Sequence, residues 1–399
     1  MKILIISNKF PYPPYDGGAL ATLNMIRGLV KNGHQITLIS LNTTKHFFGD
    51  DPEMVEIKEK IKIHLVPVNT RIRIHALVFN LLFSTYPYIL QRFHTPEMKR
   101  VLATHLDHVS YDLVQLEGLA VCQYLPSIRA HHRGPVSLRA HNVEHHIWLK
   151  RAERHRNLLI RYYSALTGRR LKKAETAALN NIDLLVPISA NDAKAFRNMG
   201  YDKPLEIIPA GIDSTGTQAV LFPSPSLVYI GALDWYPNQE GLMWFLQMVW
   251  PTLKKKVPRL ECHVAGRNAP RWLINRLKRA GILFHGEVAS ARDFLSAGWI
   301  QIVPLFTGSG IRVKILEGMS LGKAIVATPQ AAEGIPVTNG KEIILASSPR
   351  DFIHAIRRLT GKPSSITQLG QNARVFVREN FDNFVMGARL TGFYMKYCT

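Results

Sequence analysis

The first segment of the chain, residues 1–41, constrains the fold more than any other part of the sequence. Lys2 to Ser7 is almost entirely apolar, as expected of a buried parallel strand. A Pro-rich loop follows, then helical spacing from Ala19 to Lys31, which Asn32-Gly33 ends, and a second apolar run from Gln35 to Leu41. Strand, loop, helix and strand in this order form a βαβ unit, which predicts a doubly wound α/β sheet.

The same alternation begins again after a segment without periodicity. Residues 211–226 are rich in Gly, Pro, Ser and Thr, and we interpret them as a linker. Because 399 residues are many for one core, we expect two domains. The first would cover residues 1–210 and the second residues 227–381, with a last helix at 382–399 crossing back to the first. Two such domains would face each other across a cleft, where ligands of this fold bind.

A turn of small residues between a strand and a helix is the strongest candidate for a ligand site. Gly308, Ser309 and Gly310 follow a buried strand and leave backbone N–H groups uncovered at the start of the helix. Such groups, with the positive end of the helix dipole, bind anions. Arg312 and Lys314 oppose that dipole, so an anionic ligand explains them better than helix stability does.

Glu317 lies one to two turns further along the same helix. Its carboxylate would accept hydrogen bonds from a ribose diol. Together these residues predict a site for a nucleotide diphosphate. The alternative is an ordinary strand–turn–helix that carries surface cations.

The charge of the chain is strongly positive, with a net charge of +21 and a pI of about 10.0. Residues 150–173 hold nine Lys or Arg against one acid, Glu153. Such an excess indicates a polyanionic partner, either nucleic acid or an anionic membrane face. Because no aromatic stacking pattern or groove-reading motif accompanies the cations, we predict the membrane face and no nucleic acid. A non-catalytic protein that binds polyanions remains the alternative on charge alone.

The sequence also suggests where the protein acts. The apolar run from Ile74 to Leu90 is too short and too interrupted to span a bilayer. Residues 71–93 are expected to form a helix or helical hairpin, which either covers the core or dips into the membrane interface. Scattered cysteines and an N-terminus without a basic leader predict a cytoplasmic protein, peripheral on the inner face of the cytoplasmic membrane.

Histidines follow a strand in the middle of the first domain. Val136 to Ala140 is expected to be that strand, and His141, His145 and His146 come after it. Polar groups at the carboxyl end of a parallel strand mark a ligand site in this class of fold. A zinc site lacks a further carboxylate or Cys at the required spacing, so no metal is predicted.

With these motifs in view, the chain resembles GT-B glycosyltransferases of the retaining family-4 type over nearly its full length. The matching segments are Asp16-Gly17-Gly18, His141-Asn142, Ser189 after 186–188, 208–213, Gly231 to Asn238, Ala265-Gly266-Arg267 and Gly308 to Glu317. The resemblance implies transfer of a sugar from a UDP- or GDP-linked donor to a hydroxyl of a sugar or lipid-linked acceptor. The anomeric configuration would be retained, and the product would belong to polysaccharide or lipid-linked glycan synthesis.

The resemblance also assigns roles near the donor. Glu317 matches the second Glu of the family's Glu-x7-Glu motif, which holds the ribose, while Ser309 stands where the first Glu usually is. The family's Arg and Lys pair, which neutralises the diphosphate, falls by register on Ala232 and Asn238. An uncompensated diphosphate would be costly in a partly dry site, so Arg312 and Lys314, together with Arg267, are predicted to supply that charge.

Further positions follow from the same resemblance. Gly17 and Gly18 would let the backbone approach the diphosphate, and His141 would lie near the reacting sugar. Glu287 would contact the base through its backbone. The donor-binding set is completed by Gly231, Asn238, Gly308, Gly310 and Ile311.

The predicted reaction needs no cofactor and no covalent nucleophile, and an Asp-x-Asp metal motif is lacking. It is a front-face substitution in which the leaving phosphate helps deprotonate the acceptor. Because Ser309 replaces a Glu, a GT-B protein that only binds or isomerises a nucleotide sugar remains an alternative.

Overall fold

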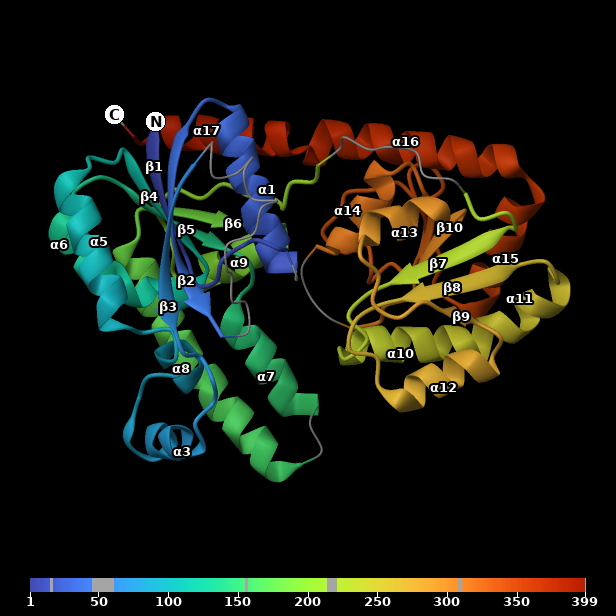
Figure 1. The fold of residues 1–399 in the computed structure, drawn as a ribbon, viewed down its shortest axis with the longest axis horizontal. Helices are drawn as coiled ribbons and strands as arrows, with labels where there is room; N and C mark the ends of the chain where they lie inside the picture. The colour runs from blue at the N-terminus through green and yellow to red at the C-terminus, as the bar shows by residue number, and fades with distance from the viewer. Residues whose placement is uncertain (15–16, 45–60, 155–156, 214–220, 308–310, 399) are drawn as a thin grey trace. The chain divides into compact units, whose positions relative to one another are not determined.

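The computed structural model describes residues 1–14, 17–44, 61–154, 157–213, 221–307 and 311–398. The chain divides into two compact units, one of Met1–Gly211 with Met386–Thr399 and one of Ile212–Val385 (Figure 1). Gly308, Ser309 and Gly310, together with Asp16 and residues 214–220 of the predicted linker, lie outside the described residues.

The first unit is built on a six-stranded parallel sheet with the order β3-β2-β1-β4-β5-β6. The strands are β1 (Lys2–Ser7), β2 (Gln35–Thr43), β3 (Ile61–Val68), β4 (Leu113–Glu117), β5 (Val136–Ala140) and β6 (Leu184–Pro187). The direction of winding reverses between β1 and β4. The carboxyl ends of these two strands therefore form a topological switch point, where ligands of this fold bind.

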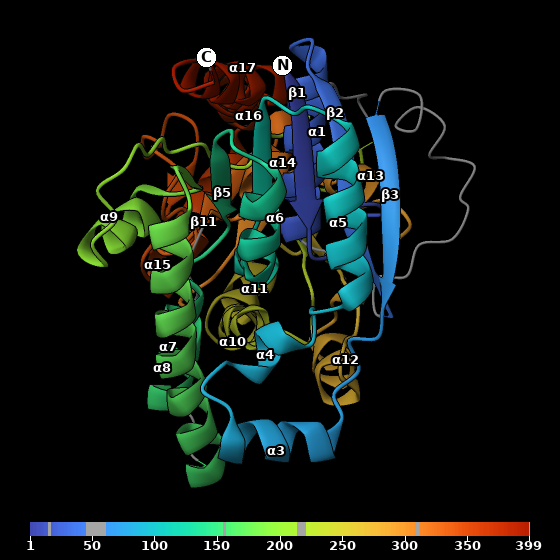
Figure 2. The ribbon, with the colours of Figure 1, turned by 90° about the vertical axis from the view of Figure 1, so that its left-hand side faces the viewer.

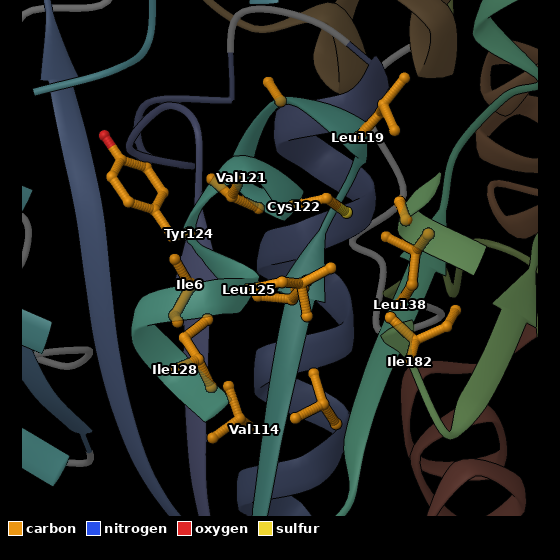
Figure 3. Close-up of a cluster of buried hydrophobic side chains, with 14 of the residues drawn as sticks. Ile6, Val114, Leu119, Val121, Cys122, Tyr124, Leu125, Ile128, Leu138 and Ile182 are labelled. Carbon is orange, nitrogen blue, oxygen red and sulfur yellow. The ribbon is translucent and has the colours of Figure 1, made fainter. Parts of the chain in front are cut away.

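Helices cover both faces of this sheet, which explains why β4 is buried throughout and β1 is buried from Ile3 onward. They include α1 (Gly17–Lys31), α5 (Pro96–His108), α6 (Leu125–His131), α9 (Ala190–Asn198) and the chain's last helix, α17 (Asn383–Met395). On one face, Val114 of β4 and Leu138 of β5 share a cluster with Leu125 and Ile128 of α6 (Figure 3). This core fixes the positions of the strand ends.

At one end of the first unit, four further helices extend beyond the sheet (Figure 2). They are α3 (Ile74–Phe83), α4 (Tyr88–Gln91), α7 (Glu144–Arg154) and α8 (Leu158–Asn181). Periodicity in the sequence predicts a long basic helical stretch at residues 147–180, which the structure divides into the separate helices α7 and α8. The Asn157 side chain accepts hydrogen bonds from the N–H groups of Leu159 and Ile160, and this N-cap starts α8 anew.

The second unit repeats the topology with a parallel sheet of order β12-β11-β10-β7-β8-β9. The strands are β7 (Ser226–Ile230), β8 (Glu261–Ala265), β9 (Leu283–Phe284), β10 (Ile300–Val303), β11 (Ala324–Ala327) and β12 (Ile344–Leu345). The switch point here lies between β7 and β10. Both sheets therefore confirm the prediction of doubly wound, Rossmann-like α/β structure.

The helices of the second unit are α10 (Tyr236–Trp244), α11 (Trp250–Lys256), α12 (Arg271–Arg279), α13 (Ala291–Ala297), α14 (Val313–Ser320), α15 (Pro349–Gly361) and α16 (Pro363–Phe381). The single helix predicted at 239–256 is interrupted by a π-helical turn at Phe245–Val249. Pro251 lacks an N–H group and cannot continue the α-helical hydrogen bonds, which accounts for the irregular turn. The helix predicted to open near Ile311 begins at Val313, because the backbone of Arg312 is still extended.

Candidate active site

Three predicted donor residues meet at the switch point of the second unit. Gly231 directly follows β7, Asn238 lies in α10, and Lys314 lies in the first turn of α14. The Lys314 Nζ donates hydrogen bonds to Asn238 Oδ1 at 2.9 Å and to the carbonyl oxygen of Ile230 at 3.3 Å. The Asn238 amide in turn donates to the carbonyl of Ala232 at 2.8 Å. The ammonium is therefore held against the turn that follows β7.

The turn after β7 packs so closely that side chains are excluded from it. A Cβ added to Gly231 would lie 2.9 Å from Asn238 Nδ2 and 3.2 Å from Lys314 Nζ. A Cβ added to Gly266, at the end of β8, would collide with the carbonyl oxygen of Gly231. Glycine at both positions lets the two strand ends and the lysine come together.

Burial brings the two ionisable side chains of α14 close to their titration midpoints at neutral pH. Burial lowers the pKa of Lys314 to about 7, an effect that Arg312 increases and Glu317 opposes. Burial raises the pKa of Glu317 to about 7, opposed by Arg292 and Lys314. An anion placed next to Lys314 would therefore raise its pKa and favour the charged form.

Arg312 adds a second, permanent cation beside Lys314. Its side chain is buried, and its guanidinium carbon lies 5.9 Å from the ring centroid of Trp235, in the loop before α10. Burial lowers its pKa while Glu333 raises it, but a guanidinium stays protonated in proteins. The beginning of α14 therefore concentrates positive charge at the switch point.

The other predicted donor residues are placed less centrally. Arg267 is partly buried, and its carbonyl accepts a hydrogen bond from the N–H of Leu233 at 2.9 Å, so its backbone supports the same turn. Ile311 is buried in the apolar cluster around α14. Glu287 is exposed in the loop after β9.

In the first unit, His141 is joined to an acid that the sequence analysis missed. His141 follows β5, and its Nε2 lies 2.7 Å from Oε2 of Glu117, the last residue of β4. The same carboxylate oxygen accepts from the Thr22 hydroxyl at 3.0 Å and from Arg139 Nη1 at 3.3 Å. Three donors thus converge on one buried oxygen at the carboxyl end of the sheet.

A buried polar chain continues from this carboxylate to α17. The Gln115 amide donates to Glu117 Oε1 at 2.5 Å, and the hydroxyl of Tyr394 donates to Gln115 Oε1 at 2.8 Å. Burial alone would raise the pKa of Glu117, but Arg139, His141 and Gln115 outweigh it and lower the pKa to about 2. Glu117 is therefore ionised at neutral pH and fixes the orientation of the His141 ring.

These groups open into a pocket of about 440 Å³ within the first unit. Its polar lining includes Lys9, Glu117, His141 and Asn142, and α4 and the residue Phe93 supply apolar walls. Gly18 also lines it, whereas Gly17 lies exposed at the start of α1. The pocket is large enough for a sugar ring and offers hydrogen-bonding groups at one end.

Glu117 is missing from the predicted site residues, although it directly follows the strand that the sequence predicts at residues 112–116. An acid in that position, which the structure places at the end of β4, was the available signal. His145, considered with His141 as a zinc ligand, is engaged differently. Its Nδ1 lies 2.5 Å from Oε2 of Glu175 in α8.

Comparison with known sequences gives matches over both units. The model of the family "Glycosyltransferase Family 4" matches residues 15–215, just over half of the chain, and that of "Glycosyl transferases group 1" matches residues 224–362. A relative described as an uncharacterised 44.6 kDa protein in the cps region of Klebsiella pneumoniae is 24% identical, with 96% of this chain and 97% of the relative aligned. An uncharacterised glycosyltransferase of Methanocaldococcus jannaschii is 32% identical over 26% of this chain and 27% of its own.

Solved structures share the fold across the whole chain. HepE of Anabaena, crystallised with UDP, has a TM-score of 0.67 at 14% identity and covers 99% of this chain and 100% of its own. Sucrose-phosphate synthase of Thermosynechococcus elongatus has a TM-score of 0.68 at 14% identity, with 99% of each chain covered. The fold is that of GT-B glycosyltransferases. The chain belongs to glycosyltransferase family 4 and is a glycosyltransferase.

Proposed function

We propose that this glycosyltransferase moves a sugar from a UDP- or GDP-linked donor to an acceptor hydroxyl with retention of anomeric configuration. The observation that carries the proposal is the buried Lys314 ammonium, held by Asn238 and the carbonyl of Ile230 beside the side-chain-free turn at Gly231. HepE, which shares the fold, has been crystallised with UDP and with UDP-glucose. That likeness supports a nucleotide sugar as the donor.

In this proposal Arg312 and Lys314 act on the leaving group. Transfer of the sugar leaves a nucleoside diphosphate that carries one more negative charge. Positioned cations in a partly dry site stabilise such developing charge without reorganising, which lowers the barrier. Glu317 would hold the ribose diol. The remaining residues proposed to bind the donor are Gly231, Asn238, Gly308, Ser309, Gly310 and Ile311. No metal ion is required by this arrangement of charges.

The first unit would supply the acceptor side of the reaction. His141, whose Nε2 donates to Glu117, would accept a hydrogen bond at Nδ1 from a hydroxyl of the transferred sugar or of the acceptor. The acceptor oxygen attacks the anomeric carbon from the face that the phosphate leaves, and the departing phosphate oxygen takes the acceptor proton. Gly17 and Gly18 at the start of α1 would allow the backbone to approach the diphosphate.

The acceptor is proposed to be a sugar or a lipid-linked glycan in polysaccharide synthesis. Support comes from the relative in the Klebsiella cps region and from the cations of α7 and α8, which suit an anionic membrane surface. The enzyme would then act in the cytoplasm, peripherally on the inner face of the cytoplasmic membrane. Nucleic acid is not proposed as a partner.

The experiment that tests this proposal has two stages. Thermal melting against a panel of UDP- and GDP-sugars identifies the donor, and incubation with the radiolabelled donor and candidate acceptors is followed by product analysis. We expect a labelled glycoside whose anomeric proton shows the donor's configuration by NMR. Donor binding without a glycoside product would favour the binding or isomerising alternative. Salt-sensitive DNA binding without any nucleotide-sugar binding would favour the polyanion-binding alternative.

A further inference from the structure

Helix α3 exposes apolar residues and buries a polar one, which is the reverse of a surface helix in water. Among its ten residues, Asn80 alone is buried. Ile74, Val78, Phe79, Leu82 and Phe83 instead point outward, with between 47% and 76% of each residue exposed. A surface helix of a water-soluble domain buries its apolar side and exposes its polar side. The reversed arrangement indicates a different environment on the outer side.

Polar contacts hold α3 in this orientation. Arg170 of α8 donates hydrogen bonds to the carbonyl and side-chain oxygens of Asn80, each at 3.2 Å, and to the carbonyl of Leu81 at 3.0 Å. The Asn80 amide donates to the Tyr86 carbonyl at 3.0 Å and to the Gln91 side chain at 2.6 Å. These contacts anchor the inner side of α3 at Asn80, so the five apolar residues on its outer side stay exposed.

A second apolar group lies at the same end of the first unit. Leu158, Leu159 and Tyr162 begin α8, and between 68% and 81% of each is exposed. Figures 1 and 2 both show α3 and the beginning of α8 at the end of the unit that lies away from the edge near the two termini. We call these two groups of exposed apolar residues together the α3–α8 surface.

Cations border the α3–α8 surface. Arg71 and Arg73 precede α3, Lys150 and Arg151 lie in α7, and Arg161 lies in α8, and all five are exposed. Apolar side chains bordered by Lys and Arg match the acyl and phosphate layers of an anionic bilayer. In a two-fold dimer through this surface the same cations would face their own copies, which opposes a second copy of the chain as the occupant.

We infer that the α3–α8 surface docks the enzyme on an anionic bilayer, with the outer side of α3 inserted among the acyl chains and the bordering cations on lipid phosphates. Across the residues that the structure describes, no helix is long and apolar enough to cross a membrane. Because the exposed apolar residues lie along one side of α3, the helix would insert parallel to the membrane plane, as other interfacial helices do. This inference rests on the membrane association proposed above and specifies the surface responsible.

Docking through this surface would also place the sugar pocket near the bilayer. Residues Ile89 and Leu90 of α4, with Arg92 and Phe93 just after it, line the pocket that contains His141. Only a short connection separates α4 from α3 along the chain. A lipid-linked acceptor embedded in the bilayer would thus reach the pocket without leaving the membrane.

The test is sedimentation of the full-length protein with vesicles of phosphatidylcholine alone and of phosphatidylcholine mixed with phosphatidylglycerol. We expect the protein to bind the mixed vesicles much more than the neutral ones, and we expect high salt to release it from the mixed vesicles. Phe79→Ser with Phe83→Ser should weaken binding to mixed vesicles roughly tenfold or more, because both rings leave the apolar layer. The control variant, Trp272→Ser with Val375→Ser, changes two exposed apolar residues of the second unit and should bind as wild type.

Unchanged vesicle binding in the Phe79 and Phe83 double variant would overturn the inference, as would equal binding to neutral and mixed vesicles. A wild-type dimer in sedimentation velocity that becomes monomeric in this variant, without any vesicle binding, would overturn it in favour of a second copy. Thermal shifts by UDP and GDP are measured on the same samples. A wild type that binds the donor but not the mixed vesicles would contradict this inference alone. A wild type that binds the mixed vesicles but no nucleotide would contradict the proposed function alone.

Discussion

Replacing Glu117 with Gln tests whether the buried carboxylate is as strongly stabilised as its contacts indicate. The substitution keeps the shape of the side chain but removes its charge. Arg139, which is fully buried with 0% of its residue exposed, then loses the anion that it faces at 3.3 Å. His141 loses the charged acceptor at 2.7 Å that orients its ring.

The expected loss of stability follows from the pKa of the acid. Its contacts lower the pKa of Glu117 from 4.5 to about 2, and a shift of this size corresponds to roughly 3 kcal/mol of unfolding free energy at pH 7. Leaving a buried partner charge uncompensated typically costs about 3–5 kcal/mol. We therefore expect Glu117→Gln to lower the unfolding free energy by about 3–5 kcal/mol.

The pH dependence of the unfolding free energy provides a second, independent test of the role of Glu117. Because the folded-state pKa is depressed, the stabilisation is present above pH 4.5 and is lost as the pH falls toward 2. The difference between wild type and Glu117→Gln should thus narrow by about 1 kcal/mol between pH 7 and pH 3.5.

Urea unfolding followed by circular dichroism at several pH values measures both quantities. The double variant Glu117→Gln with Arg139→Met serves as the control and should recover part of the loss, because it also removes the unpaired cation. A loss below about 1 kcal/mol at pH 7, the median value for exposed ion pairs, would refute the reasoning. So would a difference between wild type and variant that does not change with pH.

Two further predictions concern the second unit. Because burial holds the pKa of Lys314 at about 7, binding of a nucleoside diphosphate should raise that pKa and cause proton uptake at pH 7.5, while ionisation of Glu317 on ribose binding should release protons. Calorimetry in buffers of different ionisation enthalpy should therefore show greater net proton uptake on binding in Glu317→Gln than in wild type. Equal proton uptake in the two proteins would contradict the assignment of these two residues. Gly266→Ala should weaken donor binding and lower the melting temperature, because the added methyl group would collide with the carbonyl of Gly231. The control is Gly281→Ala, which also has a positive φ but where an added Cβ meets open space. Similar effects of both variants would count against a specific role for the turn after β7.

The sequence predicted the fold well because its signals are local. Continuous apolar runs, helical spacing and glycine-containing turns alternate along the chain, and each reflects a strand or helix that forms over neighbouring residues. Predicted helix boundaries were wrong where a single side chain determines the end of a helix. The N-cap at Asn157 and the proline at 251 divide helices that periodicity alone would continue.

The site was predicted in part for the same reason. Lys314, Asn238 and Gly231 belong to recognisable segments, and the structure brings them together. Glu117 and Arg139 belong to different strands of the parallel sheet, and their pairing appears only once β4 and β5 lie side by side. The exposed side of α3 was equally hidden, because an apolar helix in sequence does not reveal which side faces inward.

The central claim is that Lys314 and Arg312 take up the charge of the donor's diphosphate. The most direct measurement compares calorimetric affinities for the preferred nucleoside diphosphate and for its nucleoside in wild type and in Lys314→Met, with Lys255→Met, an exposed lysine of the same unit, as control. The account predicts that Lys314→Met weakens diphosphate binding roughly tenfold or more, equivalent to at least about 1.4 kcal/mol, while nucleoside affinity stays unchanged. Equal affinities of wild type and Lys314→Met for the diphosphate would contradict it.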